Sequence, residues 1–440
     1  MIFVTRHRPR TGPRKRERQR GIALVAVLIA IAITLVISNE FGTSTSTDLM
    51  AAANYRDQVV AHFLARSSLN LGEIVIRLQQ RIDNIKALRG QVQLTDYADQ
   101  LIMPFCGDPE EVEGAIGFTP NQVKGLGAEV GRCGFEGPIG TEDNKVNVNC
   151  ANVSASWQSI NSVLNALIYF PAYDYVFDDN AADGWHRERQ LQVSAIIDYI
   201  DADTMQLETR GTTEDYQYEA LKDPYFAKNT YIDTPGELKL VRGVDDRFWT
   251  LFGGSMTVYG GCKTNLAALD NTQLIAAILY LSAQNPQDPV ILDPKRLFLL
   301  ASYVSKAKQF GETFLTLNDF ITFVADPGAA VESIAKTDAG SMQGSAASSA
   351  LVSGLPGLRE QIGLQLNKGK LAQIATTSPR RTYRVRAWGE VARKAVDKNG
   401  MPVFPPIRST YTGIWDTKVV PQNVRKPPMP NGAWVFLKEE

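Results

Sequence analysis

The feature that most constrains this chain is an apolar run of sixteen residues, Ile22–Ile37, interrupted only by Thr34. The leader before it, up to Arg20, carries eight basic residues and a single acidic one, Glu17. Because basic flanks of a membrane span stay in the cytoplasm, this pattern predicts a cytoplasmic leader and a body on the other side of the membrane. The sequence therefore predicts a single-pass membrane protein with a large extracytoplasmic part.

The apolar run is short for a bilayer span of about twenty residues. Small and hydroxylated residues at 38–46 lengthen it, since a helix can carry such residues through the interface. A secretory signal peptide is the first alternative, but it requires a small-x-small cleavage site after the run, and Val36-Ile37-Ser38 fits that requirement poorly. Cleavage before the run fits better.

The residues around Gly21 have the form of a processing site. Arg18-Gln-Arg-Gly21 followed by Ile22-Ala-Leu-Val-Ala26 resembles the leader of type IV prepilins and type II secretion pseudopilins. The resemblance implies that a prepilin peptidase cuts after Gly21 on the cytoplasmic face and that the new amine of Ile22 is methylated. Most members have a glutamate as the fifth mature residue, where this chain has Ala26. That departure and the large body resemble the protein K family of minor pseudopilins, and they suit a subunit at the filament tip.

Beyond the anchor, the sequence predicts a long helix and a later group of strands. Apolar residues recur at threes and fours from Asp48 to Ala87, which predicts a helix from the membrane into the body. Alternation at 382–391, 409–415 and 432–437 predicts antiparallel strands, and helical patterns lie between. This order, with the passage Glu142–Asn149, resembles protein K throughout. It implies an α+β pseudopilin fold, in which a long N-terminal helix packs on a small antiparallel sheet and a large all-α domain is inserted.

We expect six segments along the chain. They are a prepilin-type leader (1–21), a transmembrane and amphipathic helix (22–97), the first part of the pseudopilin α/β domain (98–152), the inserted helical domain (153–328), a flexible linker region (329–375) and C-terminal strands that complete the sheet (376–440). Lys145-Val-Asn-Val and Lys263-Thr-Asn-Leu each precede a helical pattern, which indicates a weak internal duplication of strand plus helix.

Charge argues against a nucleic-acid partner. Removing the leader's eight bases and one acid from the totals of 46 and 47 leaves 38 bases and 46 acids, a net charge of −8 for the mature chain. Thr234–Trp249 resembles a helix-hairpin-helix, with a capped start at Thr234 and a glycine turn at Gly243. Asp245 and Asp246 occupy the turn that binds phosphates in DNA-binding versions of the motif. We therefore expect no nucleic-acid binding.

The four cysteines permit three complete pairings, between which the sequence does not choose. We favour a disulfide between Cys106 and Cys133. No Cys-x-x-Cys pair exists and no set of histidines lies near, so a zinc site is not expected.

Catalytic patterns are sparse. The only histidines are His7 in the leader, His62 on the long helix and His186 in a predicted loop, and they form no Ser/His/Asp or metalloprotease spacing. We therefore predict that the protein is not an enzyme.

Acidic residues offer one candidate metal site. Asp198, Asp201 and Asp203 follow a predicted helix, and Glu214 and Asp215 lie a short distance further on. Calcium prefers six to eight oxygen ligands, mostly carboxylates and carbonyls. The stretch also resembles a calcium-holding passage of protein K, with Tyr199 and Thr212-Thr213 as departures, so these five acids are the candidate ligands of a structural calcium ion. The alternative is that they cap helix ends and stay solvated.

The leading hypothesis is a non-enzymatic minor pseudopilin of a type II secretion system. The resemblance implies an inner-membrane anchor with the body in the periplasm, assembly with I-, J- and H-type minor pseudopilins and the major pseudopilin, processing by the prepilin peptidase, and contact with the secretin or exported proteins. A minor pilin of a type IV pilus is one alternative. A membrane-anchored periplasmic enzyme or receptor is the other.

Overall fold

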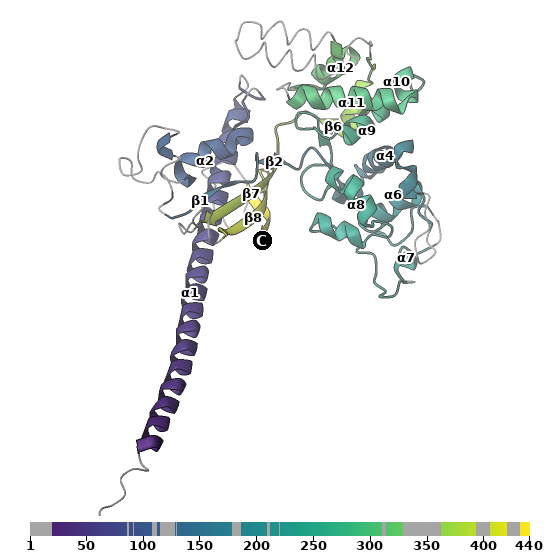
Figure 1. Ribbon diagram of the computed structural model, residues 1–440. Coiled ribbons are helices and arrows are strands. Elements are labelled where there is room, and N and C mark those ends of the chain that lie inside the picture. Colours follow the sequence, from purple (N-terminus) through teal and green to yellow (C-terminus); the bar gives the residue numbers. More distant parts are fainter. Residues whose placement is uncertain are drawn as a thin grey trace, which may run out of the picture.

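The computed structural model describes residues 20–85, 88–90, 92–107, 112–114, 128, 130–177, 186–208, 212–219, 221–309, 314–328, 362–392, 405–419 and 432–440. A long helix rises into a small sheet, and a larger helical domain lies beside that sheet (Figure 1). Of the expected leader (1–21), residues 1–19 lie outside the described part of the chain, and residues 20 and 21 form the start of the long helix.

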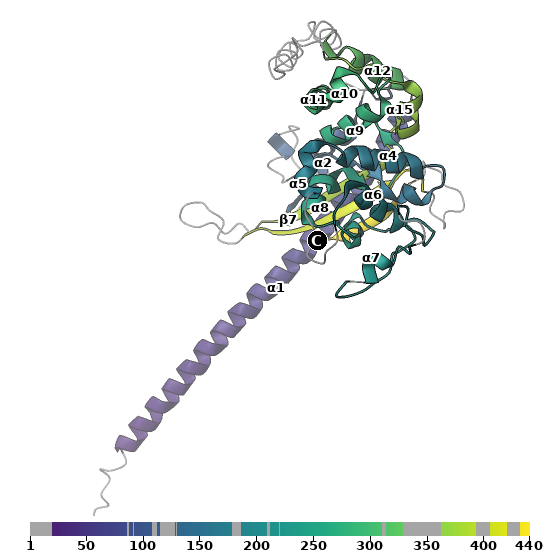
Figure 2. The same ribbon diagram turned by 90° about the vertical axis from the view of Figure 1, so that its right-hand side faces the viewer.

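Helix α1 (Arg20–Asn84) is one continuous helix of 65 residues. Its first half projects away from the rest of the molecule (Figure 2), and every residue from Ile22 to Ala52 is exposed. The helix was expected to continue to residue 97, but it ends at Asn84, where Arg89 folds back and donates to the carbonyl oxygen of Asp83. Residues 94–97 instead form a separate short 3-10 helix, η1 (Leu94–Tyr97), which leads into α2 (Ala98–Cys106).

The sheet is antiparallel and confirms the predicted strands. Its order is β1-β7-β8-β9, and β2 also pairs with β7. The strands are β1 (Arg132–Phe135), β2 (Gly140–Thr141), β7 (Thr382–Val391), β8 (Ile407–Asp416) and β9 (Ala433–Glu439). The long central strands β7 and β8 come from the end of the chain, and the short strands β1 and β2 come from before the inserted domain. Strands on both sides of the insertion in the sequence therefore pair in one sheet.

The second half of α1 packs on one face of this sheet. The shared core holds Ala65, Leu69, Val75 and Ile76 from the helix and Tyr383, Val385, Ala387 and Trp415 from the strands. Gly389 marks the closest approach, since a Cβ added there would lie 2.3 Å from both the Ala61 carbonyl oxygen and the Ala65 amide nitrogen. The other face of the sheet, which carries the strand residues that alternate with those packed on α1, points toward the helical domain. The observed fold is therefore α+β with a long helix on an antiparallel sheet, as predicted.

The helical domain contains most of the remaining elements. They are β3 (Val146–Asn147), η2 (Val148–Asn152), α4 (Trp157–Ile168), η3 (Pro171–Tyr173), α5 (Asp174–Phe177), α6 (Arg189–Asp198), α7 (Tyr216–Glu219), η4 (Pro235–Leu240), α8 (Asp246–Phe252), η5 (Gly253–Ser255), β4 (Met256–Thr257), β5 (Thr264–Asn265), α9 (Thr272–Ser282), α10 (Pro289–Leu292), α11 (Pro294–Gln309), α12 (Leu317–Ala325), α15 (Lys368–Ile374) and β6 (Ala375–Thr376). The core of this domain is centred on α9, of which Leu274–Leu279 is fully buried.

The two segments that indicated a duplication adopt the same local structure. β3 precedes α4 and pairs in parallel with β4, and β5 precedes α9 and pairs in parallel with β6. The Asn147 side chain accepts a hydrogen bond from Asn149 N and donates to Gly260 O, and Asn265 does the same with Ala267 N and Ser378 O. Each asparagine thus closes the same turn after its two-residue strand.

The expected flexible linker (329–375) requires a correction at its end. Residues 329–361 lie outside the described part, but Ile362, Leu364 and Leu366 are buried in the helical core, and α15 and β6 follow directly. The Asn367 side chain caps α15 by accepting from Gly369 N and Lys370 N. An alternating apolar triplet before a capping asparagine is typical of packed structure, and the Ala/Ser/Gly-rich composition upstream hid it.

Two disulfides connect the cysteines. Cys106 pairs with Cys133, as favoured from the sequence, and joins α2 to β1. Cys150 pairs with Cys262 and joins the beginnings of the two repeated units within the helical domain. Both pairings agree with an extracytoplasmic body.

Candidate functional site

The first candidate site is the free half of α1. It is the helix within the described residues that is long and apolar enough to cross a membrane. Its large apolar side chains are at least half exposed from Ile22, at 73%, to Ile37, at 60%. Between Gly21 and Glu40 it carries no charged residue. Such a surface is stable only in lipid or against other helices, so the structure leaves it open for either environment.

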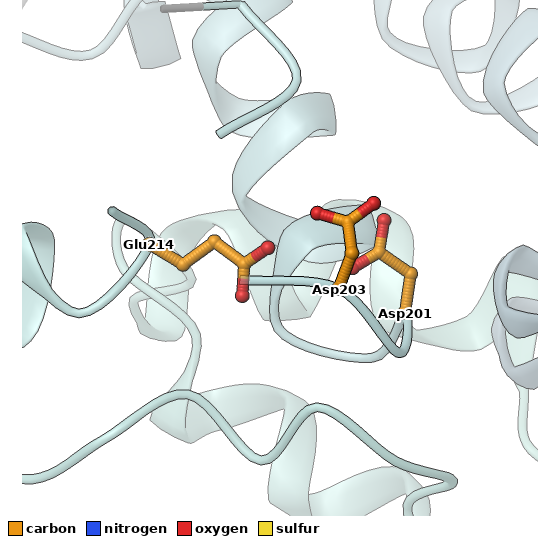
Figure 3. A group of neighbouring side chains, drawn as sticks. All are labelled: Asp201, Asp203 and Glu214. Atoms are coloured by element: carbon orange, nitrogen blue, oxygen red, sulfur yellow. The ribbon is translucent and has the colours of Figure 1, made fainter. Parts of the chain in front are cut away.

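The second candidate site is acidic and lies after α6. Carboxylate oxygens of Asp201, Asp203 and Glu214 all lie within 4.8 Å of one another (Figure 3). Asp201 and Asp203 belong to the loop that follows α6, and Glu214 lies on the returning segment, which a bridge between Met205 and Thr213 holds beside that loop. Backbone pairing therefore brings together acids that are eleven to thirteen positions apart in sequence.

Several oxygens of this acidic cluster have no partner. Both carboxylate oxygens of Glu214, which is 1% exposed, and Oδ1 of Asp201 are buried without a hydrogen bond to any described residue. Burial and then repulsion from the neighbouring acids raise the pKa of Glu214 to about 8, and the same causes raise the pKa of Asp201 to about 6. Buried, unpaired carboxylates are costly, and a bound cation would satisfy them. Three carboxylates match the kind of oxygen ligand that calcium prefers.

The other two predicted ligands lie beside the cluster. Asp198 is the last residue of α6; one of its oxygens accepts a hydrogen bond from Leu207 N, and the other is buried with no partner among the described residues. Burial, followed by repulsion from Asp201, raises its pKa to about 7. Asp215 accepts from Ala227 N, which ties the next loop to this region. The spacing along the sequence predicted the acidic region, but only the fold shows which three of the five carboxylates lie close together.

The hairpin at 234–249 has the predicted caps but a modified shape. Thr234 and Glu237 form a capping box, and Gly243 has a positive φ of 80°. The first element, η4, is a 3-10 helix rather than an α-helix. Asp245 caps α8 through Phe248 N and pairs with the buried guanidinium of Arg187 at 2.9 Å. A carboxylate thus already occupies the helix end that would receive a phosphate.

Comparison with known proteins shows a family similarity in this region. Residues 182–260, which contain the acidic cluster and the hairpin, match the family model of type II secretion system (T2SS) protein K.

No curated protein matches the chain. A chain of the crystal structure of the GspK–GspI–GspJ complex from the enterotoxigenic Escherichia coli type 2 secretion system aligns with a TM-score of 0.47 and 13% identity, over 89% of this chain and 99% of that one.

One buried polar network connects the helical domain to the sheet, and the sequence alone did not reveal its role. Glu142 is fully buried and accepts hydrogen bonds from Arg384 Nε at 2.5 Å, Lys145 Nζ at 3.2 Å and Thr257 Oγ1 at 2.6 Å. Burial alone would raise the pKa of Glu142, but Lys145 and Arg384 outweigh it and lower that pKa. Strand β7 and the helical domain therefore share one carboxylate. The acidic pair Glu142-Asp143 was the available signal, but only the fold shows that it is buried.

Proposed function

We propose that this chain is minor pseudopilin K of a type II secretion system, a non-enzymatic subunit anchored in the inner membrane with its body in the periplasm. It lies at the tip of the pseudopilus, nucleates assembly with other minor pseudopilins and aids protein export across the outer membrane. The observation that carries the proposal is α1, whose apolar half is exposed while its other half is fixed to the sheet. Because both halves belong to one continuous helix, movement of the anchor moves the body.

The proposed mechanism is physical rather than chemical. The Ile22–Ile37 segment remains in the bilayer until it packs against equivalent helices of its partners. Ala23, Ala26, Ala30 and Ala32 lie within it, and small residues allow close approach of helices in a membrane. Ala26 also leaves this subunit without a carboxylate for a neighbour's amine, which supports a position with no subunit above it.

The proposed partners are I- and J-type minor pseudopilins, as in the enterotoxigenic E. coli complex, and H-type and major pseudopilins below them. The prepilin peptidase would cut between Gly21 and Ile22. In the periplasm, Asp201, Asp203 and Glu214 would hold a calcium ion, which would fix the loop after α6 and so the surface of the helical domain.

Co-purification tests the assembly role. We expect the tagged full chain, co-expressed with I- and J-type pseudopilins and extracted in mild detergent, to elute as one complex with both. A chain that elutes without either partner, although all three are present in the extract, would contradict the proposal. Association with type IV minor pilins but not with type II pseudopilins would favour the alternative pilus role.

A further inference from the structure

A second feature of the molecule is a cleft of about 810 Å³ between the sheet and the helical domain. Its floor is the face of the sheet that points away from α1, because it is made of alternate strand residues: Arg384 and Arg386 on β7, Thr412 and Ile414 on β8, and Phe436 and Lys438 on β9. Its other wall is formed by the start of η4, by α8 and η5, and by Tyr259. Neither α1 nor the acidic cluster lines this cleft.

Basic side chains dominate the floor of this cleft. Arg386, Thr412 and Lys438 are cross-strand neighbours and form one row across three strands. Arg386 is exposed and pairs with no carboxylate within the described part of the chain. Deeper in, Lys145 and Arg384 share the single carboxylate of Glu142.

The acids at the rim offset only part of these charges, because they leave Arg386 unpaired among the described residues and Glu142 shared between Lys145 and Arg384. Glu136 pairs with Arg408 at 2.9 Å, and Glu440 pairs with Lys438 at 3.0 Å. The cleft therefore keeps a positive excess on a mature chain whose net charge is −8. A local charge opposite in sign to that of the whole chain favours a ligand of complementary charge.

Apolar groups lie next to the basic row. Ile414 is the cross-strand neighbour of Arg384, and Phe436 is that of Ile414. Tyr259 lies beside Phe436, with ring centroids 6.2 Å apart. Trp249 and Met256 complete this wall. Aromatic side chains beside arginine are the residues that most often dominate protein-binding surfaces.

We propose that this cleft binds an acidic polypeptide segment of another periplasmic protein, one that also carries an aromatic or aliphatic side chain. Carboxylates of the segment pair with Arg386, whose guanidinium group matches a carboxylate in a two-pronged geometry, and with the ammonium group of Lys438 in competition with Glu440. The apolar side chain lies against Phe436 and Tyr259. A free inorganic anion would use the basic row but would leave the aromatic wall without a partner.

The test uses the full chain in mild detergent and a fluorescein-labelled peptide, Glu-Glu-Phe-Glu-Glu-Leu-Glu-Glu, followed by fluorescence anisotropy. We expect saturable binding that is weakened about tenfold or more by the charge reversals Arg386→Glu and Lys438→Glu together, because these change attraction into repulsion. The matched control reverses two exposed lysines outside the cleft, Lys295→Glu and Lys368→Glu, and should change the affinity less than about twofold.

A second pair of variants tests the apolar part. Phe436→Ala should weaken binding about fivefold, whereas Leu437→Ala on the opposite face of β9 should leave it unchanged. Absence of saturable binding would overturn the proposal, as would equal weakening by the control lysines. Inorganic phosphate that displaces the peptide, together with a Phe436→Ala variant of unchanged affinity, would show a simple anion site and would also overturn it.

Discussion

Calcium binding at the acidic cluster should raise the thermal midpoint of unfolding. In metal-free protein, Asp201 and Glu214 face each other with unpaired, buried oxygens, and ionising them opposes folding. A cation that binds only the folded state stabilises it by about 2.7 kcal/mol when its free concentration is a hundred times the dissociation constant. For a folding unit of about 200 residues, that corresponds to a rise of about 5–10 °C in the thermal midpoint.

The effect should depend on pH with a defined sign. The folded-state pKa values of about 6 for Asp201, 7 for Asp198 and 8 for Glu214 all lie above the values near 4 of unfolded carboxyls. Without metal, the stability contributed by these groups is fully present below about pH 4 and is lost as pH rises through about 6–8. The metal-free protein should therefore unfold at lower temperature at pH 8 than at pH 6, and the gain from calcium should be largest at pH 8.

The assay is differential scanning calorimetry of the full chain in detergent, with calcium or with EDTA, from pH 5 to pH 8. Glu214→Gln should abolish most of the calcium response, and in EDTA it should unfold at or above the temperature of the unmodified chain, because a repelling charge is gone. Glu219→Gln, an exposed substitution on α7, should keep the full response. A calcium shift below about 1 °C at pH 8, or an equal loss in both variants, would refute the reasoning.

Two further predictions concern how the body is held together. Glu142→Gln should lower the free energy of unfolding by about 3 kcal/mol in urea titrations, because Lys145 and Arg384 lose the charge that they share. The control Glu136→Gln, at an exposed ion pair, should lower it by less than about 1 kcal/mol. Equal losses in the two variants would contradict the argument from burial. Gly389→Ala should push α1 away from β7 and lower the free energy of unfolding by about 3 kcal/mol in the same assay. Gly140→Ala, which has open space around it, should lower it by less than about 1 kcal/mol. A Gly389→Ala variant of unchanged stability would mean that the helix does not approach the strand this closely.

The sequence predicted those helices and strands whose hydrophobic pattern matches the faces that they bury in the folded protein. The strand at 382–391 was placed at the observed bounds because its alternation reflects one face against α1 and one face away from it. The helix of 65 residues was also expected, although its end at Asn84 was not, because the last apolar positions continue past the turn that Arg89 stabilises.

Long-range contacts account for the parts that the sequence could not predict. The packed end of the linker region depends on contacts of Leu364 with Val324, forty residues earlier, and of Leu366 with Ala283, eighty-three residues earlier. Among the five acids, Asp201, Asp203 and Glu214 form the cluster because the fold brings their carboxylate oxygens together, whereas Asp198 and Asp215 accept hydrogen bonds from Leu207 N and Ala227 N beside it. The spacing of residues along the sequence does not predict either kind of contact.

The central claim, that the apolar run is a retained assembly helix of a prepilin-type subunit, is tested most directly at the N-terminus. Mass spectrometry of the chain extracted from membranes should show a mature protein that begins at Ile22 with a methylated amine. An intact Met1, or a terminus beyond Ile37, would contradict the account.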